Sequence, residues 1–132
     1  MKKYFLVIIV CQSFLFGCGN NYCKESNKYT IEVSVDKSCY FSDRNTVNQI
    51  NGKEGVIKFI GNDTYLISTN EDLNYFACNL PDSIKINKLK IYFCGEEKEI
   101  KPTEHTLGAF LELTSVFLKD ELIGDNDSDQ VD

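Results

Sequence analysis

The fold of this chain is decided by Val56-Ile-Lys-Phe-Ile60, Gly61-Asn-Asp63 and Thr64-Tyr-Leu-Ile-Ser-Thr69. The two outer runs are rich in β-branched and aromatic residues, which favour strands. The three residues between them tolerate positive φ, and their number suits a hairpin turn. The stretch therefore predicts two antiparallel strands joined at residues 61–63.

Further strand signals lie on both sides of this hairpin. Residues 29–35 alternate apolar and polar side chains, and residues 75–80, 89–94 and 109–118 are rich in strand-forming types. Residues 36–53 show no period and predict a loop that ends in a turn at Asn51-Gly52. Pro81 ends a strand, and Asp82 or Ser83 is expected to cap a short helix over residues 84–88. The expected core contains Val56, Phe59, Leu66, Phe76, Leu89, Ile91 and Phe93.

Short strands, frequent turns and one short helix predict a mainly β fold. The expected architecture is a small antiparallel OB-like barrel, because the order from residue 55 to 118 is three strands, a helix and two strands. A β-sandwich is the alternative. We expect the β domain to span residues 29–119, and residues 120–132, which carry six acids and no base, to form a disordered acidic tail.

The N-terminus carries an export signal. Lys2 and Lys3 precede an apolar run of about 13 residues, which is shorter than the roughly 20 needed to span a membrane. The run ends in Leu15-Phe-Gly-Cys18, which resembles the lipobox of bacterial lipoproteins. This resemblance implies a signal peptide over residues 1–17, lipidation of Cys18, a tether over residues 18–28, and a membrane-anchored protein of the bacterial cell envelope. Ordinary signal cleavage is the alternative.

Four cysteines remain for the folded body: Cys23, Cys39, Cys78 and Cys94. An even number of thiols in an exported chain predicts two disulfides, with three possible connectivities. The pairs Cys23–Cys39 and Cys78–Cys94 are favoured, because they close the shortest loops. A four-thiolate zinc site is the rival, although no C-x-x-C pair is present, and we expect neither a metal nor a cofactor.

A second resemblance rests on Asn79-Leu80-Pro81, Lys85, Leu89-Lys-Ile91 and Phe93. This block resembles small lipoproteins of the Bacteroidota, which carry an N-L-P segment, a lysine and then G-L-K-V-x-F. The present chain has Asn87 and Lys88 where a glycine is usual in that family. The resemblance covers roughly residues 55–118 and implies neither an activity nor catalytic residues.

The chain offers little that points to catalysis. His105 is the single histidine and lies in a polar stretch without a nucleophile motif. Glu96, Glu97 and Glu99 are expected to be solvated charges at a strand end. Asp125-Asn-Asp-Ser-Asp129 begins like a calcium loop, but Gln130 replaces the required glycine.

Charge and surface aromatics suggest the kind of partner. Loss of Lys2 and Lys3 with the signal changes the net charge from -6 to -8, which disfavours nucleic acid. The hold on the membrane is therefore expected to come from acyl chains on Cys18. Tyr40 and Tyr75 are expected to be exposed and to contact an envelope protein. The predicted function is a non-enzymatic binding or structural module, with an inhibitor of a secreted enzyme such as lysozyme as the first alternative and a small hydrolase using His105 as the second.

Overall fold

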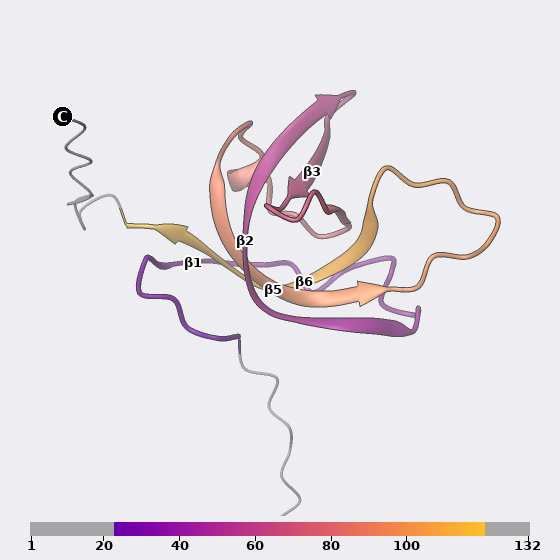
Figure 1. Cartoon of the computed structure of the whole chain (residues 1–132), viewed down its shortest axis with the longest axis horizontal. Coiled ribbons are helices and arrows are strands. Elements are labelled where there is room, and N and C mark those ends of the chain that lie inside the picture. Colours follow the sequence, from indigo (N-terminus) through magenta and orange to yellow (C-terminus); the bar gives the residue numbers. More distant parts are fainter. Residues whose placement is uncertain (1–22, 121–132) are drawn as a thin grey trace, which may run out of the picture.

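The computed structural model describes residues 23–120, and this part of the chain is mainly β (Figure 1). A single turn of 3-10 helix, η1 (Asp82–Ile84), precedes the fifth strand. The predicted mainly β class is thereby confirmed. The strands of the described residues are β1 (Tyr29–Val33), β2 (Thr46–Gly61), β3 (Thr64–Ser68), β4 (Asn74–Ala77), β5 (Lys90–Lys98) and β6 (Ala109–Lys119).

Hydrogen bonds join five of these strands into a ring. β2 pairs with β3 and β5, β3 pairs with β4, and β6 pairs with both β4 and β5. This is the closed order expected for an OB-like barrel, with η1 between β4 and β5 and with β1 added outside the ring on β6. The ring is uneven, because β3 and β4 have only 5 and 4 residues against 16 in β2. The pairing is mostly antiparallel, as expected, and β4 with β6 is the one parallel pair among the described strands.

The predicted loop over residues 36–53 is half strand. β2 already begins at Thr46 and pairs with β5 along residues 46–56. The ladder shifts register at Gly52, whose φ is +114°, so the expected turn is a bulge inside a continuing strand. A Cβ at this position would lie 2.0 Å from the Tyr92 hydroxyl, so a side chain has no room there. Most residues in this half of β2 are polar and exposed, so the sequence lacks the alternation of apolar and polar residues that would predict a strand.

The central hairpin turn is confirmed. Asn62 and Asp63 have φ of 48° and 54°, the left-handed values that a two-residue hairpin turn requires. The expected helix over residues 84–88 is wrong, because helical turns stop at Ile84. Beyond it the chain docks on β2: the Lys88 amide donates to the Ile57 carbonyl at 2.7 Å, and the Ile57 amide donates to the Leu89 carbonyl at 2.8 Å.

The core lies inside the ring. Its fully buried side chains include Ile57, Ile67, Ile91, Phe93, Leu111 and Val116. Of the expected core residues, Leu66, Ile91 and Phe93 are buried, whereas Val56, Phe76 and Leu89 are half-buried. Phe59 is 46% exposed, so its assignment to the core is wrong. It lies near the hairpin end of β2, where the ring no longer covers it.

Candidate functional site

Two disulfides join the four cysteines of the body. They link Cys23 to Cys94 and Cys39 to Cys78, with Cα–Cα separations of 5.6 and 5.4 Å. The prediction of two disulfides is confirmed, but the favoured pairing of nearest neighbours is wrong. The entropy of closing a loop changes only slowly with its length, by about 1–2 kcal/mol between short and long loops. The pairing of strands therefore outweighs this entropy difference and determines which cysteines form disulfides.

The two tyrosines expected to be exposed behave differently. Tyr40 is 69% exposed, and its ring contacts Phe41 at 4.4 Å between centroids. Tyr75 is only 2% exposed and packs edge-to-face on Phe93 in the core. The expectation that Tyr75 is exposed is wrong, because β4 turns this residue toward the interior of the ring.

Lys98, at the end of β5, holds a cluster of paired charges. Its side chain is only 5% exposed and lies 2.7 Å from a Glu96 carboxylate oxygen and 3.4 Å from one of Glu112. Burial disfavours the ammonium charge, but hydrogen bonds and attraction from the two carboxylates outweigh it and raise the pKa of Lys98. The hydrogen bond from Lys98 in turn lowers the pKa of Glu96. We call Glu96, Lys98 and Glu112 the paired-charge cluster.

A second ion pair lies beside this cluster. The Arg44 guanidinium donates to both Glu104 carboxylate oxygens, one of them at 2.6 Å, and its carbon lies 4.9 Å from the Phe110 ring centroid. Hydrogen bonds from Arg44, and then from the Lys101 amide, lower the pKa of Glu104 to about 2. The pair thus fastens the connection between β5 and β6 to the segment before β2.

The histidine and the glutamates considered as catalytic candidates do not come together in one site. His105 is exposed in the connection between β5 and β6. Glu99 accepts a hydrogen bond from the Asn45 amide nitrogen at 3.2 Å, and Glu97 accepts one from Asn48 at 3.4 Å. Glu96, Glu97 and Glu99 are half-buried and accept hydrogen bonds from side chains, so they are less solvated than expected and join β5 and the residue after it to β2 and the residue before it.

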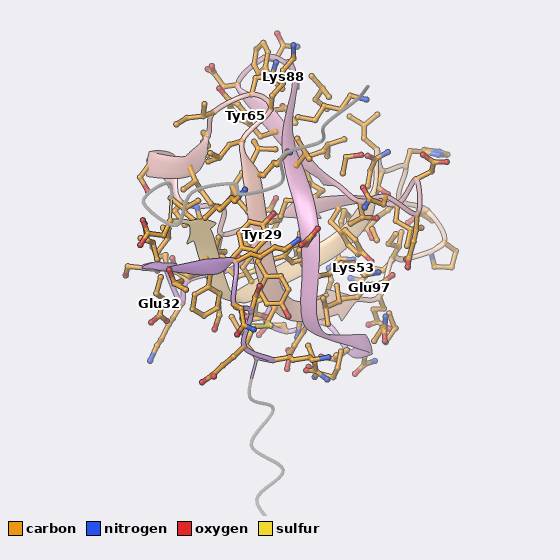
Figure 2. All side chains as sticks on the ribbon, turned by 60° about the vertical axis from the view of Figure 1, so that its left-hand side comes forward. Tyr29, Glu32, Lys53, Tyr65, Lys88 and Glu97 are labelled. Carbon is orange, nitrogen blue, oxygen red and sulfur yellow. A yellow bond between two sulfur atoms is a disulfide. The ribbon has the colours of Figure 1, made fainter. Side chains whose placement is uncertain are left out.

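The opposite end of the barrel carries a surface that we call the basic tip. It combines exposed apolar side chains with lysines, from the end of β2 and from the connection into β5. Figure 2 shows Lys88 and Tyr65 at this end, far from Glu97. The sequence reasoning missed this surface because its two segments are separate in the chain. The basic tip consists of Lys58, Phe59, Ile60, Ile86, Lys88 and Lys90.

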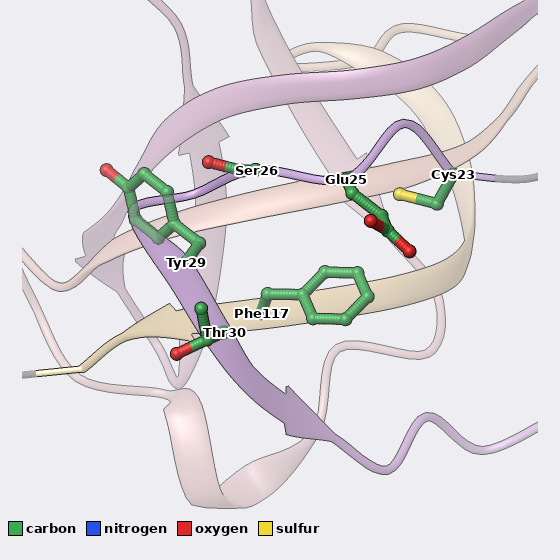
Figure 3. A pocket seen from close by; sticks show the side chains of 6 residues that line it. All are labelled: Cys23, Glu25, Ser26, Tyr29, Thr30 and Phe117. Atoms are coloured by element: carbon green, nitrogen blue, oxygen red, sulfur yellow. The ribbon is translucent and has the colours of Figure 1, made fainter.

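Clefts also open on the surface. One of about 250 Å³ lies between the N-terminal segment and β6 (Figure 3), where Tyr29, Phe117 and Glu25 line it. Another, of about 190 Å³, adjoins the basic tip and includes Tyr40, Tyr65 and Lys85. Both volumes fall below the roughly 300 Å³ at which small-molecule sites begin. A third cleft, of about 480 Å³, exceeds that size and lies between residues 32–37 and residues 112–114 of β6.

Several predicted features lie outside residues 23–120: the signal peptide, Cys18, the first part of the tether, and the acidic tail beyond Asp120. Between residues 23 and 120, no helix has the length and apolar character needed to cross a membrane. The same residues gather no group of three or more His, Cys, Asp or Glu side chains suited to a metal. No family model matches the chain, and no curated protein or solved structure is significantly similar to it.

Proposed function

We propose that this chain is a lipid-anchored lipoprotein of the bacterial cell envelope whose β domain acts as a non-enzymatic binding or structural module. The export half of the proposal draws support from the two disulfides, because such bonds persist in oxidising compartments. It also draws on the lipobox-like Leu15-Phe-Gly-Cys18.

The disulfide between Cys23 and Cys94 is the observation that carries the proposal. It fastens the chain to the middle of β5 only five residues after Cys18. The Lys24 amide also donates to the Asn51 carbonyl at 3.2 Å. Residues 23–28, expected to belong to a tether, are therefore fixed to the barrel at their start. Five residues extend to at most about 17 Å, so acylation at Cys18 would hold the body at the membrane surface.

The binding half of the proposal rests on where the charged groups lie. The carboxylates that could serve an acid–base mechanism are engaged by Lys98, Arg44 or amide groups, and His105 stands in an exposed connection. At the other end, apolar side chains and lysines of the basic tip face solvent. Exposed surfaces of this composition favour recognition over turnover.

Fatty-acid labelling tests the anchor. Cells expressing the full chain should incorporate labelled palmitate into it, and Cys18→Ser should abolish the label. Cys11→Ser, in the same leader, is the matched control and should leave labelling intact. Label that survives Cys18→Ser would contradict the anchor.

Two assays test the module. The oxidised domain should inhibit no lysozyme and should release no product from a panel of ester and peptide substrates. Inhibition that weakens with salt would instead favour an enzyme inhibitor, and turnover abolished by His105→Ala would favour a hydrolase.

A further inference from the structure

The lysines of the basic tip are not neutralised. Lys58, Lys88 and Lys90 are exposed and form no salt bridge with any residue from 23 to 120, whereas the neighbouring Lys85 pairs with Asp82 at 2.6 Å. The ladder places Lys90 opposite Val56, so Lys90 and Lys58 are diagonal neighbours on adjacent strands. Asp82 at this end is paired with Lys85, which leaves Asp63, in the turn after β2, against these three lysines. This end is therefore positively charged in a chain whose net charge is -6.

Apolar side chains are exposed beside these lysines. Ile86 is 55% exposed, Phe59 46% and Ile60 37%. The Phe59 ring packs on Tyr65 at 5.2 Å between centroids, so it is partly supported while the rest of it meets solvent. Apolar side chains that reach between lysines are the combination with which proteins bind the headgroup region of a bilayer.

The fold holds the backbone of Lys88 in the left-handed region. Its φ is 71°, a left-handed conformation that glycine adopts without strain and a lysine does not. The Lys88 amide donates to the Ile57 carbonyl at 2.7 Å, so the docking of this segment on β2 accounts for the conformation. The Lys88 side chain makes no hydrogen bond or ion pair with any residue from 23 to 120, so its charge is available to a partner.

One face of β5 connects the basic tip with the attachment point of the N-terminal segment. Lys90 and Cys94 lie four residues apart on β5, on the same face, which corresponds to about 13 Å. Cys94 holds Cys23 on that face. In Figure 2 the N-terminal segment and Lys88 lie toward opposite ends of the barrel, so the anchor and the basic tip reach one membrane together when the barrel lies on the side that carries Lys90 and Cys94.

We propose that the basic tip docks on the surface of an anionic phospholipid bilayer, with Phe59, Ile60 and Ile86 entering the headgroup region and the three free lysines contacting lipid phosphates. This inference deepens the proposed function and rests on it: acyl chains on Cys18 would attach the protein to the membrane, and the basic tip would orient the barrel on its surface. It also revises the expectation that acyl chains alone provide the hold: the net charge is acidic, but the contacting surface is basic.

A bilayer fits this surface better than other anionic partners. Nucleic acid or an acidic glycan would use the lysines but gain little from two exposed isoleucines. A bilayer accepts apolar side chains of any shape and attracts each nearby lysine. Both kinds of side chain at the basic tip are then used.

Vesicle binding tests the proposal without the anchor. The chain from residue 18 onward, with Cys18→Ser, keeps every described residue and cannot be acylated. It should sediment with vesicles of phosphatidylglycerol and phosphatidylcholine, bind phosphatidylcholine alone weakly, and lose affinity as salt is raised. Replacing Lys58, Lys88 and Lys90 with serine should weaken binding about a hundredfold, at about fivefold per lysine.

Matched variants separate the basic tip from charge or hydrophobicity in general. Replacing Lys28, Lys37 and Lys101 with serine changes the net charge equally and should leave binding within about twofold. Ile60→Ser with Ile86→Ser should weaken binding, whereas Val47→Ser with Leu107→Ser, at sites 60% and 69% exposed, should not. Equal losses in tip and control variants, equal binding to soluble polyaspartate, or no vesicle binding at low salt would overturn the proposal. Because this protein lacks Cys18, such a failure is distinct from a failure of acylation.

Discussion

The lysines at the two ends of the β2–β5 ribbon have opposite environments. At one end Lys98 is 5% exposed and lies between the carboxylates of Glu96 and Glu112. At the other end Lys58, Lys88 and Lys90 are exposed and lack acidic partners among the described residues. The first arrangement uses charge to hold strands together, and the second presents it to the surroundings.

This difference shows why net charge is a poor guide to partners. The charge of -6 describes the chain at long range, where it repels other anions. At the paired end Lys98 and Arg44 are neutralised by carboxylates. The lysines of the basic tip have no such partners among the described residues, so they set the charge of that end. A surface that contacts a partner is governed by its own charges within about 10 Å, since salt screens the rest.

The largest expected effect comes from breaking the disulfide that holds the N-terminal segment on β5, between the two ends. The Cys23–Cys94 bond closes a separation of 71 residues and holds the N-terminal segment on β5. Cys23→Ser with Cys94→Ser should lower the free energy of unfolding by about 4 kcal/mol, because the unfolded chain regains freedom. Denaturant unfolding measures this, and an unchanged midpoint and slope would contradict a bond at this position.

A smaller loss is expected when the paired-charge cluster is broken. Lys98→Met leaves Glu96 and Glu112 close together without their cation, and should cost about 2 kcal/mol. The figure is below that of fully buried pairs, because the two carboxylate side chains are 31% and 20% exposed. Lys101→Met, at an exposed site, is the control and should change stability little. Equal effects in the two variants would show that the cluster does not support the fold.

A gain in stability is expected at the basic tip. Lys88→Gly relieves a φ of 71° and should raise the free energy of unfolding by about 1 kcal/mol. Lys88→Ala removes the same charge but keeps the strained backbone, so it should change stability little. If both variants behave alike, the strain at Lys88 has no energetic consequence.

Acid should weaken the paired end through Glu104. Its pKa of about 2 in the fold lies below the usual 4.5, so the folded state binds this proton less readily than the unfolded state. The pair with Arg44 therefore stabilises the fold above about pH 4.5, and that contribution is lost as the pH falls toward 2. Melting temperatures of the wild type and Glu104→Gln should converge over this range. A constant difference between them would argue against the pair.

The sequence predicted correctly those elements that depend on neighbouring residue types. The turn at Asn62-Asp63, the strands around it and the OB-like order follow from residue types and spacing. The first half of β2 does not, because the bulge at Gly52 interrupts the pattern of alternation. Disulfide partners and the buried state of Tyr75 depend on which strands meet, and a single sequence gives no measure of that.

Prediction of the surface sites from sequence is limited in the same way, because a surface depends on which segments meet. Tyr40 is exposed as expected, although its role as a contact stays a prediction. The basic tip joins residues 58–60 to residues 86–90 through hydrogen bonds between Ile57 and the chain before β5. Each segment alone is an ordinary mix of lysines and apolar residues, so only their meeting defines a surface.

The central claim is that paired lysine serves the fold and free lysine serves the membrane. Stability and vesicle affinity, measured together on Lys98→Met and on the combined Lys58→Ser, Lys88→Ser and Lys90→Ser variant, test it most directly. We predict that Lys98→Met loses about 2 kcal/mol of stability and keeps its affinity at temperatures where it is folded. The triple variant should keep its stability and lose about a hundredfold in affinity for anionic vesicles. A triple variant that binds like the wild type, or a folded Lys98→Met protein that no longer binds, would contradict the claim.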